Sequence, residues 1–436
     1  MKHTLLCPAD QYVIRTFDGF RCRAWEGIVY CVSPAEPIQK LNLYAPECYF
    51  EGGSLNDYTA YSAPIFLPNT VGGYMPGPAA EPALNGEGQP NTVLAALMHG
   101  YVTACAGIRG RSTPTGKAPA LIVDMKAVIR YLRHNRALIP GDTEKMITNG
   151  TSAGGALSAM TGASGNAPAY QPYLDEIGAA DERDDIFAAS CYCPIINLEN
   201  ADPAYEWQFA PEHFYRGWHG EGLMDDDQAA LAQALKPLFP PYLNSLGLMD
   251  ENGHPLTLDA DGNGSFADRV RGYVIQSAQR ALDENKGGIP GLPYLTVENG
   301  RVTAIDWPAY IHAITRMKSP PAFDALDLSS PENDVFGGTH FTAFALAHSQ
   351  KNGVIADDSP VRLINPMKQL DSPGLAKHWR IRHGSFDRDT SLAIPVILAE
   401  SLRMRGCHVD FHLPWGVPHS GDYDLPELFR WIDSLA

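Results

Sequence analysis

The sequence predicts an α/β fold with a parallel sheet, because strand patterns and helix patterns alternate along the chain. Residues 99–107 read as a buried strand, residues 120–133 have apolar side chains at helical spacing, and residues 144–149 read as the next short strand. A parallel sheet requires this alternation. The pattern returns late in the chain, where strands are expected at 377–384 and 408–413 and helices at 391–405 and 425–435.

A Gly-x-Ser-x-Gly sequence follows the strand expected at 144–149. Ser152 stands between Gly150 and Gly154, and residues 156–160 are small or apolar and suit a buried helix. A strand, a sharp turn and a helix make the nucleophile elbow of the α/β-hydrolase fold, where glycines two residues to either side leave room for the strained serine. The sequence therefore predicts Ser152 as a nucleophile above an α/β-hydrolase sheet.

Two segments are expected to supply an oxyanion hole for Ser152. Ala153 would lie at the N-terminus of the helix after the elbow, where its N–H can stabilise negative charge. Residues 64–74 read as a buried strand that runs into Gly72 and Gly73, at the place where this fold provides its second N–H. Either glycine is expected in that role, although a turn that needs positive φ explains each of them equally well.

A serine hydroxyl needs a general base and an acid that orients the base. His419 lies in the loop after the last expected strand, and Asp387 lies in the loop after the preceding one. The chain order serine, aspartate, histidine is the order that this fold uses. The sequence therefore predicts the triad Ser152, Asp387 and His419. Other histidines are interpreted as structural, at positions 99, 134, 340 and 383.

Residues from about 200 to 365 interrupt the sheet pattern with irregular, polar helices. An insertion between core strands is the usual place for a lid, so we expect a core at 1–199 and 366–436 and a lid domain at 200–365. Residues 259–264 resemble the first half of a calcium loop. Because Val270 stands where that loop needs a glutamate, a polar turn is favoured and no metal is expected.

Charge and composition narrow the possible partners. The chain has 436 residues and a formal net charge of −17, which would repel nucleic acid and anionic membranes and suits a small substrate. No apolar stretch approaches the roughly 20 residues of a membrane span, and the N-terminal apolar run is too short for a signal peptide. The eight cysteines form no CxxC pair, so free thiols and a cytoplasmic location are expected. Cys191 and Cys193 are interpreted as buried strand residues rather than a redox pair or metal corner, and no cofactor is expected.

Four segments together resemble the bacterial tannases, and the resemblance runs over most of the chain. They are residues 68–74, 150–155, 201–207 and 382–391. The resemblance implies an α/β-hydrolase with a large lid, in which a serine triad cleaves galloyl esters through an acyl-enzyme. On this pattern the triad is again Ser152, Asp387 and His419.

The resemblance also implies a site for the gallate ring. In tannases a lysine, a glutamate and an aspartate hold the three phenolic hydroxyls, and the matching residues are Lys318, Glu332 and Asp389. Each phenolic hydroxyl can donate and accept hydrogen bonds. Two carboxylates and one ammonium can therefore form hydrogen bonds with all three hydroxyls of the ring. An ordinary surface salt bridge is the alternative for Lys318 and for Glu332.

The expected activity is therefore that of a carboxylic ester hydrolase acting on galloyl esters, with small phenolic esters as its partners. A feruloyl or other phenolic-ester esterase on the same scaffold is the nearest alternative. A prolyl-type serine peptidase would use the same triad but would normally carry a recognisable accessory domain. A non-catalytic binding protein is disfavoured because all three triad positions are occupied.

Overall fold

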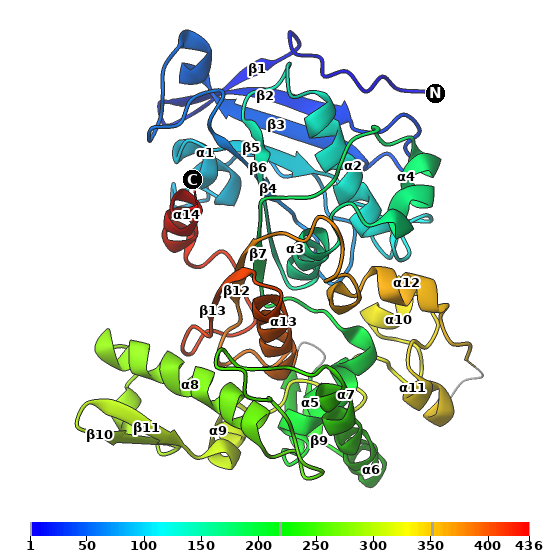
Figure 1. Cartoon of the computed structure of the whole chain (residues 1–436), viewed down its shortest axis with the longest axis vertical. Coiled ribbons are helices and arrows are strands. Elements are labelled where there is room, and N and C mark those ends of the chain that lie inside the picture. Colours follow the sequence, from blue (N-terminus) through cyan, green and yellow to red (C-terminus); the bar gives the residue numbers. More distant parts are fainter. Residues whose placement is uncertain (1, 218–219, 350–352, 436) are drawn as a thin grey trace. The chain divides into compact units, whose positions relative to one another are not determined.

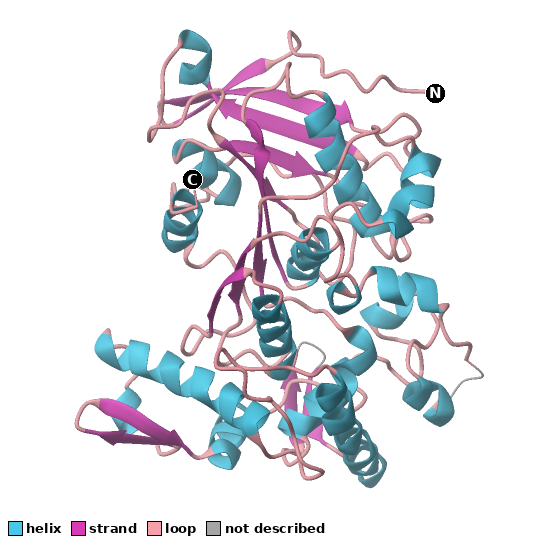
Figure 2. Cartoon of the chain, viewed as in Figure 1, coloured by secondary structure: helices cyan, strands magenta, loops and turns pink. Residues whose placement is uncertain are grey.

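The computed structural model of the chain describes residues 2–217, 220–349 and 353–435, which group into two compact units. Unit 1 comprises Met1–Pro194, Asp358–Trp379 and Gly421–Ala436, and unit 2 comprises Ile195–Asp357 and Arg380–Ser420. Figure 1 labels the elements along the chain, and Figure 2 separates helices from strands by colour.

The bounds of the units differ from the predicted division into core and lid, because residues 380–420 group with most of the expected lid. Hydrogen bonds between helices α13 (Ala393–Met404) and α8 (Ser265–Asp283) explain part of this grouping. The Glu400 carboxylate accepts a bond of 2.8 Å from Arg269 and one of 2.6 Å from the Tyr273 hydroxyl. The division into a core at 1–199 and 366–436 and a lid at 200–365 stays a prediction.

The sheet of unit 1 changes from antiparallel to parallel across its width. Its seven strands lie in the order β1-β2-β3-β5-β4-β6-β7. The pairs β1–β2, β2–β3 and β3–β5 are antiparallel, and the pairs β5–β4, β4–β6 and β6–β7 are parallel. The strands are β1 (Val13–Phe17), β2 (Phe20–Val29), β3 (Lys40–Pro46), β4 (Pro64–Pro68), β5 (Val102–Ala106), β6 (Asp142–Thr151) and β7 (Ala188–Tyr192).

Helices cover both faces of this sheet. Figure 1 shows α1 and α14 on one side of the strands and α2, α3 and α4 on the other. Strands β4, β5 and β7 are buried along their whole length, as expected for parallel strands that helices cover on both faces. The helices of unit 1 are α1 (Thr92–Met98), α2 (Ala120–His134), α3 (Ala153–Ala163), α4 (Gln171–Ile177), α12 (Asp358–Leu363) and α14 (Leu425–Asp433), with 3₁₀ turns η1 (Glu47–Glu51), η2 (Pro168–Tyr170) and η6 (Pro366–Lys368).

Unit 2 is mainly helical. Strand β12 (His378–Arg382) begins in unit 1 and ends in unit 2, where β13 (His408–His412) is its neighbour. The remaining strands form two antiparallel hairpins, β8 (Phe214–Gly217) with β9 (Gly220–Leu223) and β10 (Leu295–Glu298) with β11 (Arg301–Ile305). Besides α8 and α13, the helices are α5 (Ala201–Phe209), α6 (Asp226–Leu235), α7 (Phe239–Ser245), α9 (Trp307–Ile314), α10 (Pro331–Val335) and α11 (Ala343–His348), with 3₁₀ turns η3 (Leu198–Asn200), η4 (Lys236–Leu238) and η5 (Ile289–Gly291).

The predicted elements near the elbow are confirmed with small shifts at their ends. The helix expected at 120–133 is α2, the strand expected at 144–149 lies within β6, and the late pattern appears as β12, α13, β13 and α14. The α/β fold class is confirmed. Within the described ranges, no helix is both long enough and apolar enough to span a bilayer.

A buried ion cluster ties α2 to the end of α3 and to the loop before β7. The Lys126 ammonium donates to Asp184 at 2.7 Å and to the Ser164 carbonyl at 2.6 Å, and Arg130 Nε donates to Asp184 at 2.8 Å. Burial raises the pKa of Asp184, but Lys126 and Arg130 outweigh it and hold this pKa below its ordinary value. The carboxylate therefore stabilises the helices that flank the elbow strand.

Replacing Asp184 with Asn should lower the free energy of unfolding by about 3–5 kcal/mol at neutral pH, because Lys126 keeps its buried charge without a counter-ion. A carboxylate whose pKa is lower in the folded state stabilises the fold fully at pH values above its unfolded-state pKa. This contribution is lost as the pH falls through the folded-state pKa. Urea unfolding at pH 7 and at low pH measures both effects. Asp175→Asn, on the exposed surface of α4, is the control. Equal losses in the two variants would contradict the account.

Candidate active site

Ser152 lies in a sharp turn between β6 and α3. Its backbone has φ 61° and ψ −123°, which is strained for a residue with a Cβ atom. The Ser152 N–H donates to the Tyr192 carbonyl of β7 at 3.0 Å, so the turn is anchored to the neighbouring strand. This conformation agrees with the elbow that the sequence predicts.

Three glycines allow the chain to approach itself closely around this turn. A Cβ atom at Gly150 would lie 2.3 Å from the Gly154 carbonyl oxygen, and one at Gly154 would lie 2.7 Å from the Val71 carbonyl oxygen. At Gly155 it would lie 2.3 Å from the Tyr192 carbonyl oxygen. These contacts confirm that Gly150 and Gly154 have a steric role, and they add Gly155, whose role the sequence pattern did not indicate.

Asn69 joins the elbow to the loop after β4. Its amide nitrogen donates to the carbonyls of Asn149 and Gly154, each at 3.0 Å. Its amide oxygen accepts the Val71 N–H at 3.2 Å. One side chain therefore sets the position of the glycine pair relative to the elbow. Asn69 lies in the segment 68–74 that resembles the tannases, but no local sequence pattern indicates this role.

The second glycine of the pair and the tyrosine after it lie in the left-handed region of backbone conformation. Gly73 and Tyr74 have φ values of 52° and 57°. Arg111 Nε donates to the Gly73 carbonyl at 2.8 Å, so the loop after β5 is tied to this one. Because the Val71 N–H is already bonded to Asn69, Gly72 and Gly73 remain the candidates for the second oxyanion donor, with Ala153 for the first.

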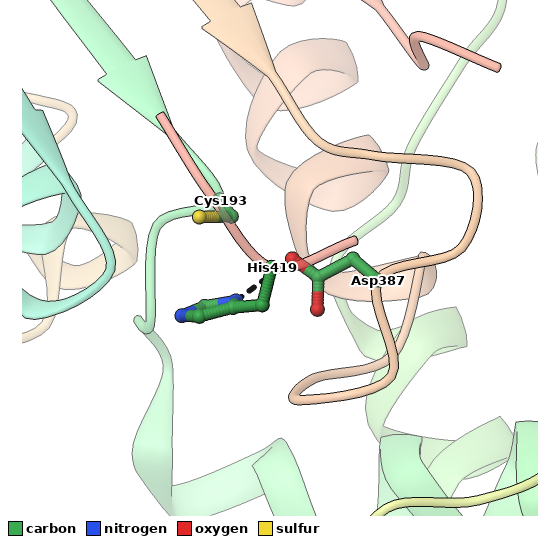
Figure 3. Close-up of side chains that lie close together, drawn as sticks. All are labelled: Cys193, Asp387 and His419. Carbon is green, nitrogen blue, oxygen red and sulfur yellow. Dashed lines mark hydrogen bonds and ion pairs between the residues drawn. The ribbon is translucent and has the colours of Figure 1, made fainter. Parts of the chain in front are cut away.

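In unit 2, the expected base and acid form a pair. His419 Nδ1 and Asp387 Oδ2 lie 2.8 Å apart, as the dashed line in Figure 3 marks, and the Asp387 side chain is fully buried. Burial raises the pKa of Asp387, but His383 and His419 outweigh it and hold this pKa below its ordinary value. An ionised Asp387 can fix the orientation of the imidazole with its Nδ1–H toward the carboxylate.

Backbone contacts lock the two loops that carry this pair. A Cβ atom at Gly384 would lie 2.0 Å from the Val417 carbonyl oxygen, so only glycine allows the loops to cross there. The Phe386 N–H donates to that same carbonyl at 3.1 Å. The Ser385 hydroxyl accepts the Gly416 N–H at 2.9 Å. The loops that carry Asp387 and His419 are therefore held in fixed positions relative to each other.

Two of the other histidines, His99 and His383, have partners or surroundings of their own. His99 pairs with Asp433 at 2.9 Å. His383 is fully buried, and its Nε2 lies 3.8 Å from Asp387 Oδ2. Burial lowers the pKa of His383 below its ordinary value. Sequence reasoning did not anticipate this neighbour of the acid.

Unit 2 contains a second chain of serine, histidine and aspartate. Asp324 and His340 Nδ1 lie 2.7 Å apart, and His340 Nε2 lies 2.9 Å from the Ser349 hydroxyl. The Asp324 carboxylate also accepts the N–H groups of Phe341 and Thr342, at 2.9 and 2.8 Å. Ser349 has ordinary backbone angles, φ −58° and ψ 137°, unlike the strained nucleophile of an elbow. We interpret this chain as a brace for the segment before α11.

The three residues expected to bind a phenolic ring form an electrostatic cluster in unit 2. Lys318 Nζ lies 3.1 Å from Asp389 Oδ1 and 4.0 Å from the centre of the Phe323 ring. Burial lowers the pKa of Lys318, but the charges of Asp389 and Glu332 outweigh it and hold this pKa above its ordinary value. Glu332, in α10, is itself buried. The partly buried Lys318–Asp389 pair, under the charge of a buried Glu332, is more than an exposed salt bridge, and its binding role stays a prediction.

The turn at 259–264 is held by its own hydrogen bonds, and the cysteines at 191 and 193 are buried. In the turn at 259–264, Asp259 Oδ1 accepts the N–H groups of Asp261 and Asn263 at 3.0 and 2.9 Å, which agrees with a polar turn. Cys191 lies in β7 and is buried, in agreement with its structural interpretation. Cys193 is also buried, but it follows the end of β7 and has φ 35°, so it is not the strand residue that the sequence predicts.

Replacing Gly154 with Ala should force the elbow away from Asn69. We expect a loss of about 1–3 kcal/mol in the free energy of unfolding from overpacking. Labelling of Ser152 by a fluorophosphonate probe should slow at least about tenfold, because displacement of a nucleophile by about 1 Å costs that much or more. Gly86→Ala, where an added Cβ meets nothing within 4 Å, is the control. Unchanged labelling in Gly154→Ala would contradict the steric role.

The region that contains the elbow matches a known family of hydrolases. The BD-FAE family model, which describes α/β-hydrolases, matches residues 72–206. Esterase LipQ of Mycobacterium tuberculosis is 34% identical over 111 residues, which is 25% of this chain and 25% of LipQ. The match therefore spans about a quarter of that curated relative.

Solved structures match the whole chain. The tannin acyl hydrolase from Lactobacillus plantarum is 47% identical, with a TM-score of 0.95 over 99% of this chain and 98% of that one. The tannase of Fusobacterium nucleatum is 46% identical, with a TM-score of 0.96 over 99% of each chain. A tannin acyl hydrolase in complex with ethyl gallate is 48% identical, with a TM-score of 0.95 over 99% of this chain and 98% of that one. With this identity over nearly its full length, the chain belongs to the tannase family of carboxylic ester hydrolases.

Proposed function

We propose that the protein is a serine esterase that hydrolyses galloyl esters, with Ser152 as nucleophile, His419 as base and Asp387 as the acid that orients it. One observation carries the proposal most directly. Asp387 pairs with His419, and two residues later Asp389 pairs with Lys318, while the Asp389 N–H donates to Asp387 Oδ1 at 2.9 Å. A single short loop therefore carries a carboxylate for catalysis and a carboxylate for recognition.

The triad would act by acyl transfer. The Ser152 Oγ attacks the ester carbonyl as its proton passes to His419, and the N–H of Ala153 with that of Gly72 or Gly73 stabilises the oxyanion. The C–O bond to the alcohol breaks, and the alcohol leaves with the proton from His419. Water, deprotonated by the same imidazole, then attacks the carbonyl of the galloyl-enzyme. The bond from the acyl carbon to Ser152 Oγ breaks, His419 returns its proton to Oγ, and gallic acid leaves.

Recognition of the ring would depend on Lys318, Glu332 and Asp389. The two carboxylates accept bonds from phenolic hydroxyls, and the ammonium donates to a phenolic oxygen. An ester whose ring lacks these hydroxyls would leave partly buried charges without partners. Sites built to bond a particular hydroxyl can reject the analogue that lacks it by a factor on the order of 10⁴.

We infer that residues 200–365 act as the lid of the enzyme, since they carry Lys318 and Glu332. A cytoplasmic location is proposed because no cysteine in the described part of the chain forms a disulfide, which suits a reducing compartment. The net charge of −17 supports a small phenolic ester, rather than nucleic acid or a membrane surface, as the partner.

Hydrolysis of methyl gallate and ethyl ferulate by the purified chain tests the proposed function. A ferulate ring has one hydroxyl and one methoxy group. With a single O–H donor, it cannot form hydrogen bonds with both carboxylates and the ammonium. We expect kcat/KM for methyl gallate to exceed that for ethyl ferulate by at least about a hundredfold. A preference for ethyl ferulate would reject the gallate assignment in favour of a feruloyl esterase.

The two neighbouring acids should respond differently to replacement by Asn. Asp387→Asn should lower kcat on every ester by several powers of ten, up to about 10⁴, because His419 then favours the wrong tautomer. Asp389→Asn should lower kcat/KM for methyl gallate far more than for phenyl acetate. Steady-state kinetics on both substrates measure the contrast. The same pattern of losses in both variants would remove the proposed division of roles.

Truncating Lys318 or Glu332 to Ala should remove one charge-assisted bond to the ring. We expect each change to cost about 1.5–3 kcal/mol in kcat/KM for methyl gallate, or roughly ten- to a hundredfold. Methyl benzoate offers no hydroxyl, so its slow turnover should be nearly unaffected, and a fluorophosphonate probe should still label the enzyme. Lys286→Ala, which removes an exposed ion pair with Glu284, is the control. Full gallate preference in both site variants would show that other groups recognise the ring.

A further inference from the structure

The segment at 201–207 resembles the tannases in sequence, yet no step of the proposed reaction uses it. It forms helix α5, in unit 2. Asp202, Tyr205 and Glu206 stand at positions i, i+3 and i+4 and therefore share one face of the helix. All three side chains belong to buried residues, so their contacts lie inside the protein.

The two acids of this face hold both ends of the segment that carries Lys318. At one end, Glu206 receives two bonds from the Arg316 guanidinium, at 3.0 and 2.5 Å, and neither side chain is exposed. At the other end, Asp202 accepts the N–H groups of Phe323 and Asp324 at 2.8 and 3.0 Å. The Phe323 ring in turn lies beneath the Lys318 ammonium.

Tyr205 holds the middle of the segment and also reaches the loop of the triad acid. Its hydroxyl oxygen accepts the N–H groups of Met317 and Lys318, at 3.0 and 3.1 Å. The same hydroxyl donates to the carbonyl of Arg388, the residue before Asp389, at 3.0 Å. A hydroxyl has one donor and two acceptor positions, so these three bonds use its full capacity.

We propose that Tyr205 is a positioning residue for ring recognition, and that the Asp202–Tyr205–Glu206 face of α5 sets the separation between the Lys318 ammonium and the Asp389 carboxylate. This inference rests on the proposed function. A lysine side chain is long and flexible, so an ammonium can match fixed phenolic oxygens only if its backbone is itself fixed. One hydroxyl bonded to both partner segments supplies that constraint.

Tyr205→Phe tests the inference because it keeps the ring, which packs against Phe209 and Phe323, and removes only the hydroxyl. We expect kcat/KM for methyl gallate to fall about tenfold to a hundredfold, mainly through KM, while kcat/KM for methyl benzoate changes less than about threefold. Tyr170→Phe is the matched control, because it removes a buried hydroxyl that donates to the Leu363 carbonyl of unit 1 at 2.7 Å. The control should leave the ratio of the two substrates unchanged.

A double-variant cycle separates positioning from general damage to the fold. If Tyr205 acts through Lys318, its removal in the Lys318→Ala background should cause less than half of its original effect on methyl gallate, on a logarithmic scale. An equal effect in both backgrounds would overturn the inference, as would equal losses on gallate and benzoate. Should Tyr205→Phe fail to fold, Asp202→Asn loosens the same segment at its other end and should lower the same ratio. An unchanged ratio in Asp202→Asn would overturn the inference.

The same experiment distinguishes failure of the inference from failure of the proposed function. If Lys318→Ala loses the preference for gallate while Tyr205→Phe keeps it, Tyr205 has no positioning role and the proposed function stands. If Lys318→Ala itself keeps the full preference, the gallate assignment fails, and the inference that rests on it fails too.

Discussion

The close approach of the chain to itself around Ser152 is the constraint on which the rest of unit 1 depends. Positive φ at a serine is costly, and it persists only where neighbouring structure fixes it. Here Gly150 and Gly154 bring β6, α3 and the loop after β4 within contact, and Asn69 fastens them with three hydrogen bonds. Because α3 starts in this crowded turn and is buried on every side, it can contain only small and apolar residues along most of its length.

Unit 2 combines buried charges with local rigidity. The Lys318 ammonium pairs with Asp389 and also feels the charge of Glu332, and the Arg316–Glu206 pair has no exposure at all. An ion pair in such a place contributes little net stability, but breaking it leaves an uncompensated charge, so its geometry is strongly defined. The short spacing from Asp387 to Asp389 then couples the orientation of the imidazole to the position of the groups proposed to bind the ring. Catalysis and recognition would share one support.

The sequence predicts those features that leave a local pattern. The helix at 120–133, the elbow between β6 and α3 and the loops of Asp387 and His419 follow from apolar spacing, glycine positions and chain order. Asn69 and Tyr205 act through bonds to segments more than 75 residues away, and such contacts have no periodicity to detect. The grouping of residues 380–420 with unit 2 likewise arises from side-chain bonds such as Glu400 to Arg269. Lys318 and Glu332 were identified only through a family resemblance.

The central claim is that Ser152 is the nucleophile of a gallate esterase. Titration with a fluorophosphonate probe tests it, with the labelled peptide mapped by mass spectrometry and methyl gallate hydrolysis measured at each step. The account predicts that activity falls in proportion to label on Ser152 and disappears at one label per chain. Activity that survives complete labelling of Ser152, or loss of activity that follows label on another serine such as Ser349, would contradict it.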